Sequence, residues 1–331
     1  MRAANPQSQS RQSLRSQPTW LRNGILLGNA FHYRKKNHWL HNGLNLSVLA
    51  MIVAGVGTLA VIGRMLPPIV FIPLGALVSG YGYFALFILT VHEASHNMFL
   101  LLKNRRRSHQ WNRLIGWLVC IPLGIDYVQH WEIGHRTHHL NPCTVIDPQN
   151  CPSTLYTGPA LFKFVGKTLA VPGFIQFSAK GYHCPATTVY PFNSKLLLAQ
   201  VSVWSIFLAL SIASGYWMLP VAAFLGLQVL AAMNLFKIAM EHGGEISQQE
   251  NAYVRSTTSL FPLRAVLMPL NISLHFEHHL NDSVPWYDLM RYHKALKTLV
   301  PDQVRSQVYA SNRQVWARIS SPMPTRDAQM K

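Results

Sequence analysis

Four long apolar stretches constrain this chain more than any other feature of its sequence. They cover residues 44–63, 69–91, 196–216 and 219–240, and Lys237 is the only Lys, Arg, Asp or Glu within them. A helix of about 20 residues is about 30 Å long, which is the thickness of the hydrocarbon core of a bilayer. Only 12% of all residues are charged, about half the fraction in an ordinary soluble domain. The sequence therefore predicts an all-α integral membrane protein with four transmembrane helices in two hairpins.

The basic residues lie mostly outside these stretches and predict the topology. The chain has 29 Lys and Arg against 12 Asp and Glu, a formal net charge of +17, and only Arg64 falls in the two short connectors. Because basic residues collect on the cytoplasmic side of membrane proteins, we expect both termini and the central region there. We predict a basic cytoplasmic segment at 1–43, a membrane domain at 44–300 and a cytoplasmic tail at 301–331. Such a surface suits anionic membrane lipid, and without a nucleic-acid-binding motif we expect no nucleic-acid partner.

Histidine spacing is the second informative feature, since 16 of the 331 residues are histidine. The motif His-Glu-Ala-Ser-His begins at His92, and the pattern H-x-x-H-H occurs twice, from His135 and from His275. Positions i, i+3 and i+4 of a helix share one face, so the imidazoles of each motif can converge. With one further histidine at the end of the fourth stretch, the candidate metal ligands are His92, His96, His135, His138, His139, His242, His275, His278 and His279.

The number of these imidazoles indicates the kind of metal site that they can build. Neutral imidazole is a ligand for iron, zinc, copper and nickel. Nine are too many for one ion, because a structural zinc site is complete with four ligands, whereas two ions with four or five nitrogens each would use the set. We expect the clusters to meet in a cytoplasmic helical cap. A redox-active metal pair beside a bilayer suits oxygen activation and removal of hydrogen from an apolar chain.

The three motifs resemble the histidine boxes of the membrane-bound fatty acid desaturase and hydroxylase family. The order HEASH, HRTHH and HFEHH, the two spans between the second and third boxes and the Pro-Trp-Tyr segment from Pro285 are similar to the family pattern over about residues 70–295. The resemblance implies a di-iron centre bound by all nine histidines. It implies that one iron takes His92, His96, His135, His139 and His279, and that the other takes His138, His242, His275 and His278.

One position departs from the family pattern. Relatives have an asparagine four residues before the lone histidine, where it holds a water molecule at the metal, but this chain has Ile238 there. Metal-bound imidazoles usually donate their second N–H to a carboxylate or a carbonyl. Glu241 and Glu277 lie beside or within the histidine motifs and are expected to accept such hydrogen bonds, with Glu93 and Glu132 as further candidates.

The function that the resemblance implies is O2-dependent desaturation of a fatty acyl chain lying in an apolar tunnel. The sequence has no flavin, haem or iron–sulfur motif, so we expect electrons from an external donor. A ferredoxin, a cytochrome b5-like protein or a rubredoxin would serve. Hydroxylation and decarboxylation to a terminal alkene stay open as other outcomes of the same chemistry. A metal transporter and an inactive membrane scaffold are the alternatives from other classes.

The remaining histidines and the cysteines are expected to take no part in catalysis. The cysteines Cys120, Cys143, Cys151 and Cys184 form no C-x-x-C pair and are predicted to be reduced. The histidines without partners at ligand spacing are predicted to face lipid headgroups; they are His32, His38, His41, His109, His130, His183 and His293.

Overall fold

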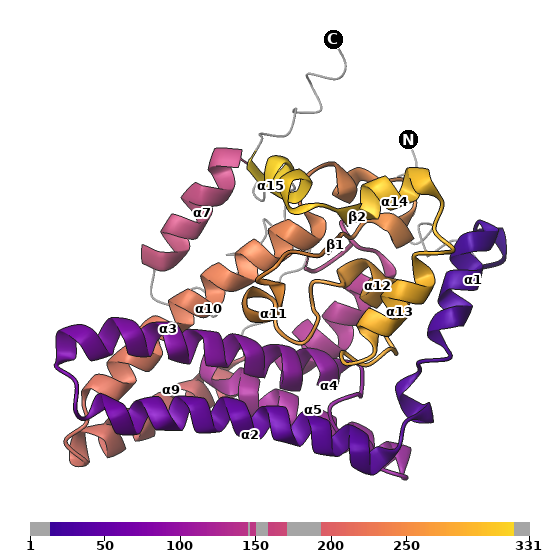
Figure 1. The fold of residues 1–331 in the computed structure, drawn as a ribbon. Coiled ribbons are helices and arrows are strands. Elements are labelled where there is room, and N and C mark those ends of the chain that lie inside the picture. Colours follow the sequence, from indigo (N-terminus) through magenta and orange to yellow (C-terminus); the bar gives the residue numbers. More distant parts are fainter. Residues whose placement is uncertain (1–13, 145, 150–157, 171–192, 321–331) are drawn as a thin grey trace, which may run out of the picture.

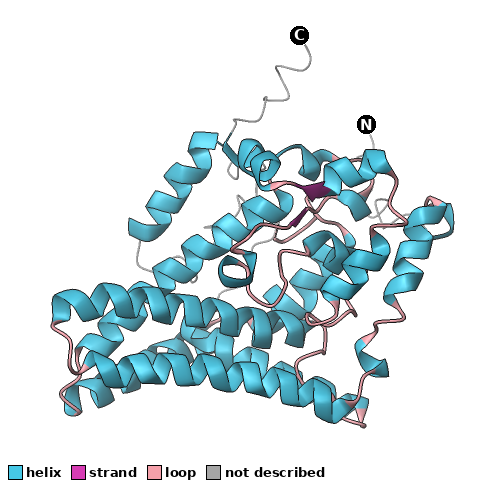
Figure 2. Cartoon of the chain, in the orientation of Figure 1, coloured by secondary structure: helices cyan, strands magenta, loops and turns pink. Residues whose placement is uncertain are grey.

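The computed structural model describes residues 14–144, 146–149, 158–170 and 193–320 (Figure 1). Within these residues the regular secondary structure is helical apart from two very short strands, as Figure 2 shows. Strands β1 (Thr258–Ser259) and β2 (Tyr309–Ala310) pair in parallel, with Thr258 opposite Tyr309. The predicted helical architecture is therefore confirmed, and this strand pair, which the sequence analysis did not predict, is a small addition to it.

Among the residues that the structure describes, four helices are long and apolar enough to cross a membrane, as predicted. The first begins before the predicted residue 44, because the side chain of Asn37 accepts hydrogen bonds from the N–H groups of Trp39 and Leu40 and so caps the helix. The second is continuous from Pro68 to Ser95 and contains a π-helical turn. The helices are α2 (His38–Gly63), α3 (Pro68–Phe87) with η4 (Ile88–His92) and α4 (Glu93–Ser95), α9 (Ser194–Ala213) and α10 (Met218–His242).

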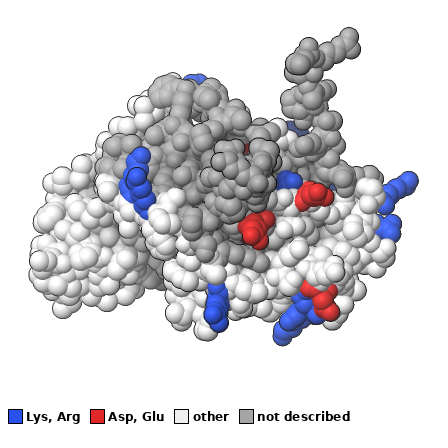
Figure 3. All heavy atoms as spheres, turned by 90° about the horizontal axis from the view of Figure 1, so that it is seen from above, with Lys and Arg blue, Asp and Glu red and all other residues white. Residues whose placement is uncertain are grey.

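Apolar side chains cover the outer surfaces of α2 and α9. Val61 on α2 is 70% exposed, and Leu198 on α9 is 69% exposed. In Figure 3 the left end of the molecule shows no charged side chain, and the few charged side chains that are visible lie in the middle and on the right. A surface of this kind is costly in water and is the surface expected against lipid hydrocarbon. The helices therefore have the character of an integral membrane protein.

Helix α3 packs most closely against α10, which comes from the other half of the chain. A Cβ atom on Gly80 would lie 2.6 Å from the carbonyl oxygen of Gly226, and one on Gly75 would lie 2.8 Å from Cβ of Ala222. Small residues at these positions let the two backbones approach closely, as in other membrane helix pairs. This contact fixes the relative position of two helices that both lead into histidine motifs.

Shorter helices gather where α4 and α10 end (Figure 1). Leu21, Phe276, Tyr292 and Val308 are fully buried in one core, which joins segments from both ends of the chain to the third histidine motif. This core supports the short helix that carries His275, His278 and His279. The short helices in this part of the structure are α1 (Thr19–Gly28), α11 (Arg264–Leu267), α12 (His275–Leu280), α13 (Leu289–Leu296), α14 (Asp302–Val308) and α15 (Asn312–Ser320).

The segment between the two pairs of long helices supplies the second histidine motif. The amphipathic helix α5 (Arg105–Cys120) is followed by the π-helical turn η6 (Val128–His135) and α6 (Arg136–Leu140). Helix α7 (Gly158–Ala170) lies against α10. Cys151, His183 and Cys184 lie outside the described residues, so their predicted roles stay predictions.

Candidate metal centre

Four separate segments bring the nine predicted histidines together. His92 ends the π-helical turn η4 and His96 follows α4, while His135 ends the second π-helical turn, η6. π-Helical turns of this kind are rare and recur at functional sites. The remaining members lie on α6, at the last residue of α10 and on α12; they are His138, His139, His242, His275, His278 and His279.

The histidines form two groups, and in each the candidate ligand nitrogens all lie within 4.8 Å of one another. We call them the five-histidine group and the four-histidine group. The two groups adjoin through His139 and His279, whose rings stack with centroids 4.2 Å apart. The five-histidine group is His92, His96, His135, His139 and His278. The four-histidine group is His138, His242, His275 and His279.

The grouping corrects the predicted division between the two metals. His278 and His279 exchange places relative to the prediction: the ring of His278 lies 4.5 Å from that of His92, whereas the ring of His279 lies 5.0 Å from that of His242. Consecutive helical residues point about 100° apart, so α12 sends these two neighbours to different groups. Which neighbour enters which group depends on the rotation of α12 about its axis.

The chemistry of both groups fits metal ions. Nε2 of His96 and Nε2 of His278 are buried and have no hydrogen-bond partner in the described part of the chain. In the four-histidine group, Nε2 of His242 and Nε2 of His275 lie 2.9 Å apart and point at each other. Buried nitrogens without a hydrogen-bond partner, such as Nε2 of His96 and Nε2 of His278, are costly, and a cation among them would remove that cost. These observations fit two ions, each with imidazole ligands.

Burial also favours the protonation state that a metal needs. Desolvation first, and then the neighbouring charges of other imidazoles, lower the pKa of the histidines well below the ordinary value of 6.5 at five positions outside the long helices. Neutral imidazole can donate an electron pair to a metal, whereas imidazolium cannot. These histidines are His135, His139, His275, His278 and His279.

Polar groups that the sequence analysis missed orient three of the imidazoles. Nδ1 of His138 lies 2.8 Å from Oδ2 of Asp147, and Nδ1 of His135 lies 2.9 Å from Oε1 of Gln149. Nδ1 of His242 lies 2.8 Å from the carbonyl oxygen of Arg255. Such contacts fix ring orientation and leave Nε2 for the metal. Asp147 had one usable signal, as it is one of only 12 acidic residues and lies shortly after the second motif.

The two glutamates singled out from the sequence differ in their contacts. Oε1 of Glu241 lies 3.3 Å from Nδ1 of His275, and Oε2 lies 2.7 Å from Nζ of Lys237. Glu277 instead contacts Nδ1 of His293 at 2.6 Å and the hydroxyl of Thr258. The prediction that Glu277 supports a candidate ligand is therefore wrong, because its place on α12 directs it away from both groups.

The two further acidic candidates also differ. Oε1 of Glu93 lies 3.7 Å from Nδ1 of His92, which places it beside the five-histidine group. Glu132 pairs with Arg113 at 3.0 Å instead of supporting an imidazole. An unpredicted carboxylate, Asp282, lies 3.5 Å from Nδ1 of His96.

Two histidines expected at lipid headgroups are buried inside the protein. Nδ1 of His41 lies 2.8 Å from the hydroxyl of Tyr287, and His293 contacts Glu277. Tyr287 lies 246 residues from His41 and Glu277 lies 16 residues from His293, so neither partner is at a spacing that a helix pattern reveals. His32 and His38 are half-buried, and His109 is exposed.

Ile238 occupies the position at which relatives have asparagine. Its side chain packs against an apolar cluster that includes Leu161, Val165 and Leu235. This cluster joins α7 to α10. The position therefore contributes to helix packing in this chain.

The comparison with known families decides the assignment. A family model for fatty acid desaturases matches residues 67–310. The chain belongs to the fatty acid desaturase family. No curated protein matches it. In this family member, the matched region begins just before α3 and ends with β2, so it contains all nine histidines and three of the four long helices. The family consists of oxidoreductases of the di-iron type, in agreement with the two histidine groups.

Proposed function

We propose that this desaturase-family protein introduces a double bond into a fatty acyl chain, using O2 and two iron ions. The observation that carries the proposal is the pair of adjoining histidine groups at the ends of apolar helices. The five-histidine group would hold one ion and the four-histidine group the other. Together they provide nine imidazole nitrogens, which agrees with the di-iron type of the family.

With O2, two iron ions at such a site supply an oxidant that can remove hydrogen from an unactivated C–H bond. In the overall reaction the acyl chain loses two hydrogen atoms from neighbouring methylenes, while O2, two electrons and two protons become two water molecules. The residues of this chain would hold the ions, keep the imidazoles neutral and position the substrate. Positioning decides which carbon reacts, because the chain has many chemically equivalent methylenes.

An apolar wall beside the five-histidine group is suited to the acyl chain. The ring of Trp131 lies 4.8 Å from that of His135 and 5.0 Å from that of Phe87. Trp131 belongs to the largest apolar cluster, which extends between the long helices through Ile88 and Leu230. We place the acyl chain along this cluster, where hydrocarbon contacts exclude water from the reacting carbons.

The topology is part of the proposal. We assign α2 with α3 and α9 with α10 to two transmembrane hairpins, with the histidine groups in a cytoplasmic cap. Residues 1–43 and 301–331 would also be cytoplasmic, because basic residues favour that side of the membrane. A basic cytoplasmic surface would also guide an acidic electron donor such as a ferredoxin, a cytochrome b5-like protein or a rubredoxin.

Lipid analysis of cells that express the full chain tests this proposal. We expect new internal double bonds by mass spectrometry, and we expect His138→Ala to abolish them and to lower iron content while the protein still inserts. Arg136→Ala, on the exposed side of the same helix α6, is the matched control and should keep the product. Alcohols or 1-alkenes as the sole products would instead identify a hydroxylase or a decarboxylase. Unchanged product from His138→Ala would contradict a role for the four-histidine group.

A further inference from the structure

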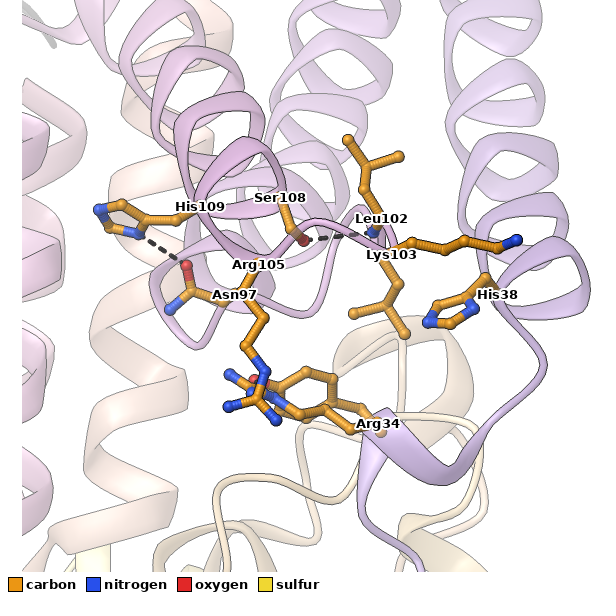
Figure 4. A pocket seen from close by; sticks show the side chains of 10 residues that line it. Arg34, His38, Asn97, Leu102, Lys103, Arg105, Ser108 and His109 are labelled. Carbon is orange, nitrogen blue, oxygen red and sulfur yellow. Dashed lines mark hydrogen bonds between the residues drawn. The ribbon is translucent and has the colours of Figure 1, made fainter.

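A cavity of about 290 Å³ lies where α2 and α5 begin, and none of the nine histidines lines it (Figure 4). Its walls come from the turn η3 (Tyr33–Lys35), the first residue of α2, the segment after the first histidine motif and the first turn of α5. Four parts of the chain therefore meet around one hollow. The proposed desaturation assigns no role to it.

The cavity has an unbalanced positive charge. Arg34, Lys103 and Arg105 line it, and no acidic residue among those that the structure describes does. None of these three cations forms an ion pair with any residue that the structure describes. Positive charges around one cavity repel one another, and an anion bound in the cavity would reduce that repulsion.

The positive charge around the cavity also affects the pKa of the neighbouring His32 side chain. Burial lowers the pKa of His32 most, and the charges of Arg34, Lys35 and Arg105 lower it further. The charge of Asp282 opposes this effect, but that carboxylate lies 3.5 Å from Nδ1 of His96, beside the five-histidine group. The positive field at the cavity is therefore only partly offset.

Hydrogen bonds hold the walls of the cavity in place. Nε of Arg34 donates to the hydroxyl of Tyr33 at 3.0 Å, which leaves the terminal guanidinium nitrogens free of that bond. The imidazole of His109 contacts the side-chain oxygen of Asn97 at 2.8 Å, as Figure 4 shows. Because these groups are already ordered, a ligand would lose little affinity to ordering them.

The cavity lies between elements that carry interfacial side chains. Trp39, in the first turn of α2, is 87% exposed, and α5 exposes Trp111 and Leu118. Tryptophan is enriched where the hydrocarbon core of a bilayer meets the headgroups. Polar cavity residues next to such side chains lie at headgroup depth, where the phosphate groups of the lipids are found.

We propose that this cavity binds the phosphate group of an anionic membrane phospholipid. Arginine forms paired hydrogen bonds with phosphate oxygens, and Lys103 adds a third positive charge. The apolar side chains beside the cavity would contact the upper part of the acyl tails. The bound lipid would anchor the start of α2 to the segment that follows the first histidine motif.

Lipid titration of the purified full chain in neutral detergent tests the proposal. Short-chain phosphatidylglycerol should raise the melting temperature at lower concentration than phosphatidylcholine, and inorganic phosphate at the same concentration should have little effect. The double variant Lys103→Gln/Arg105→Gln should weaken the apparent affinity for phosphatidylglycerol at least about tenfold, because each basic residue near a membrane surface contributes about fivefold.

A matched variant separates the cavity from the general basic surface. Arg106→Gln/Arg107→Gln removes the same charge from the same turn of α5 at residues that do not line the cavity, and it should keep wild-type affinity. Equal losses in the two double variants would overturn the proposal. An equal response to inorganic phosphate would also overturn it, since the site would then prefer free phosphate. Lipid binding is measured without turnover, so this result is independent of the desaturation test.

Discussion

Oδ2 of Asp147 lies 2.8 Å from Nδ1 of His138, and both side chains are buried. The same oxygen accepts a hydrogen bond from the backbone N–H of Cys143 at 2.9 Å. The carboxylate is thus held by the backbone on one side and orients the imidazole on the other. Nε2 of His138 is left to face the rest of the four-histidine group.

Replacing this carboxylate by an amide should weaken the metal site without removing a ligand. Asp147→Asn keeps the size of the side chain but loses the charge that strengthens the imidazole as a ligand, so iron affinity should fall about 10- to 100-fold. Competition with a chelator measures this affinity. Asp302→Asn, whose side chain is 91% exposed, is the control and should behave as wild type. An unchanged affinity in Asp147→Asn would show that His138 needs no such partner.

The exchange of His278 and His279 between the groups has a measurable consequence. His278→Ala leaves four histidines in the five-histidine group, whereas His279→Ala leaves three in the other group. Since a four-ligand set holds an ion much better than a three-ligand set, His278→Ala should retain about two irons and His279→Ala about one. Iron analysis after gel filtration distinguishes them. The division implied by the family resemblance predicts the reverse result.

The packing of Ile238 predicts the effect of restoring the family's usual residue. Ile238→Asn places an amide against the apolar cluster of Leu161 and Leu235, which should cost about 1–3 kcal/mol and lower the melting temperature. Iron content should stay the same, because no contact to the histidine groups is lost. Ile238→Val is the control for lost volume alone. A raised iron affinity in Ile238→Asn would indicate that the side chain reaches the metal instead.

The sequence was sufficient to identify the four long apolar helices and the histidines that the structure brings together, because both depend on local periodicity. Apolar runs of bilayer length and i, i+3, i+4 spacing can be recognised in a sequence without knowledge of the tertiary fold. Asp147, Gln149 and Arg255 were not predicted, because loops bring them to the imidazoles and loop paths have no periodic signal. Glu277 was assigned to the wrong partner for a related reason. The histidines beside it on α12 belong to the five-histidine and four-histidine groups, but Glu277 itself contacts His293, which lies on α13.

The ion pair of half-buried Lys237 and buried Glu241 gives the last prediction. Nζ of Lys237 lies 2.7 Å from Oε2 of Glu241, whose other oxygen lies 3.3 Å from Nδ1 of His275. Lys237→Gln leaves a buried carboxylate without its cation, which should cost up to about 3–5 kcal/mol. The double variant Lys237→Gln/Glu241→Gln removes both charges and should regain most of the melting temperature.

Iron affinity should separate the two roles of Glu241. In the double variant the carboxylate beside His275 is still missing, so iron should be released about tenfold faster than from wild type even though stability has recovered. Glu245→Gln removes an exposed carboxylate four residues further along and should change neither property. Wild-type iron release from the double variant would mean that Glu241 serves only to neutralise Lys237, and that His275 is oriented by its packing on α12.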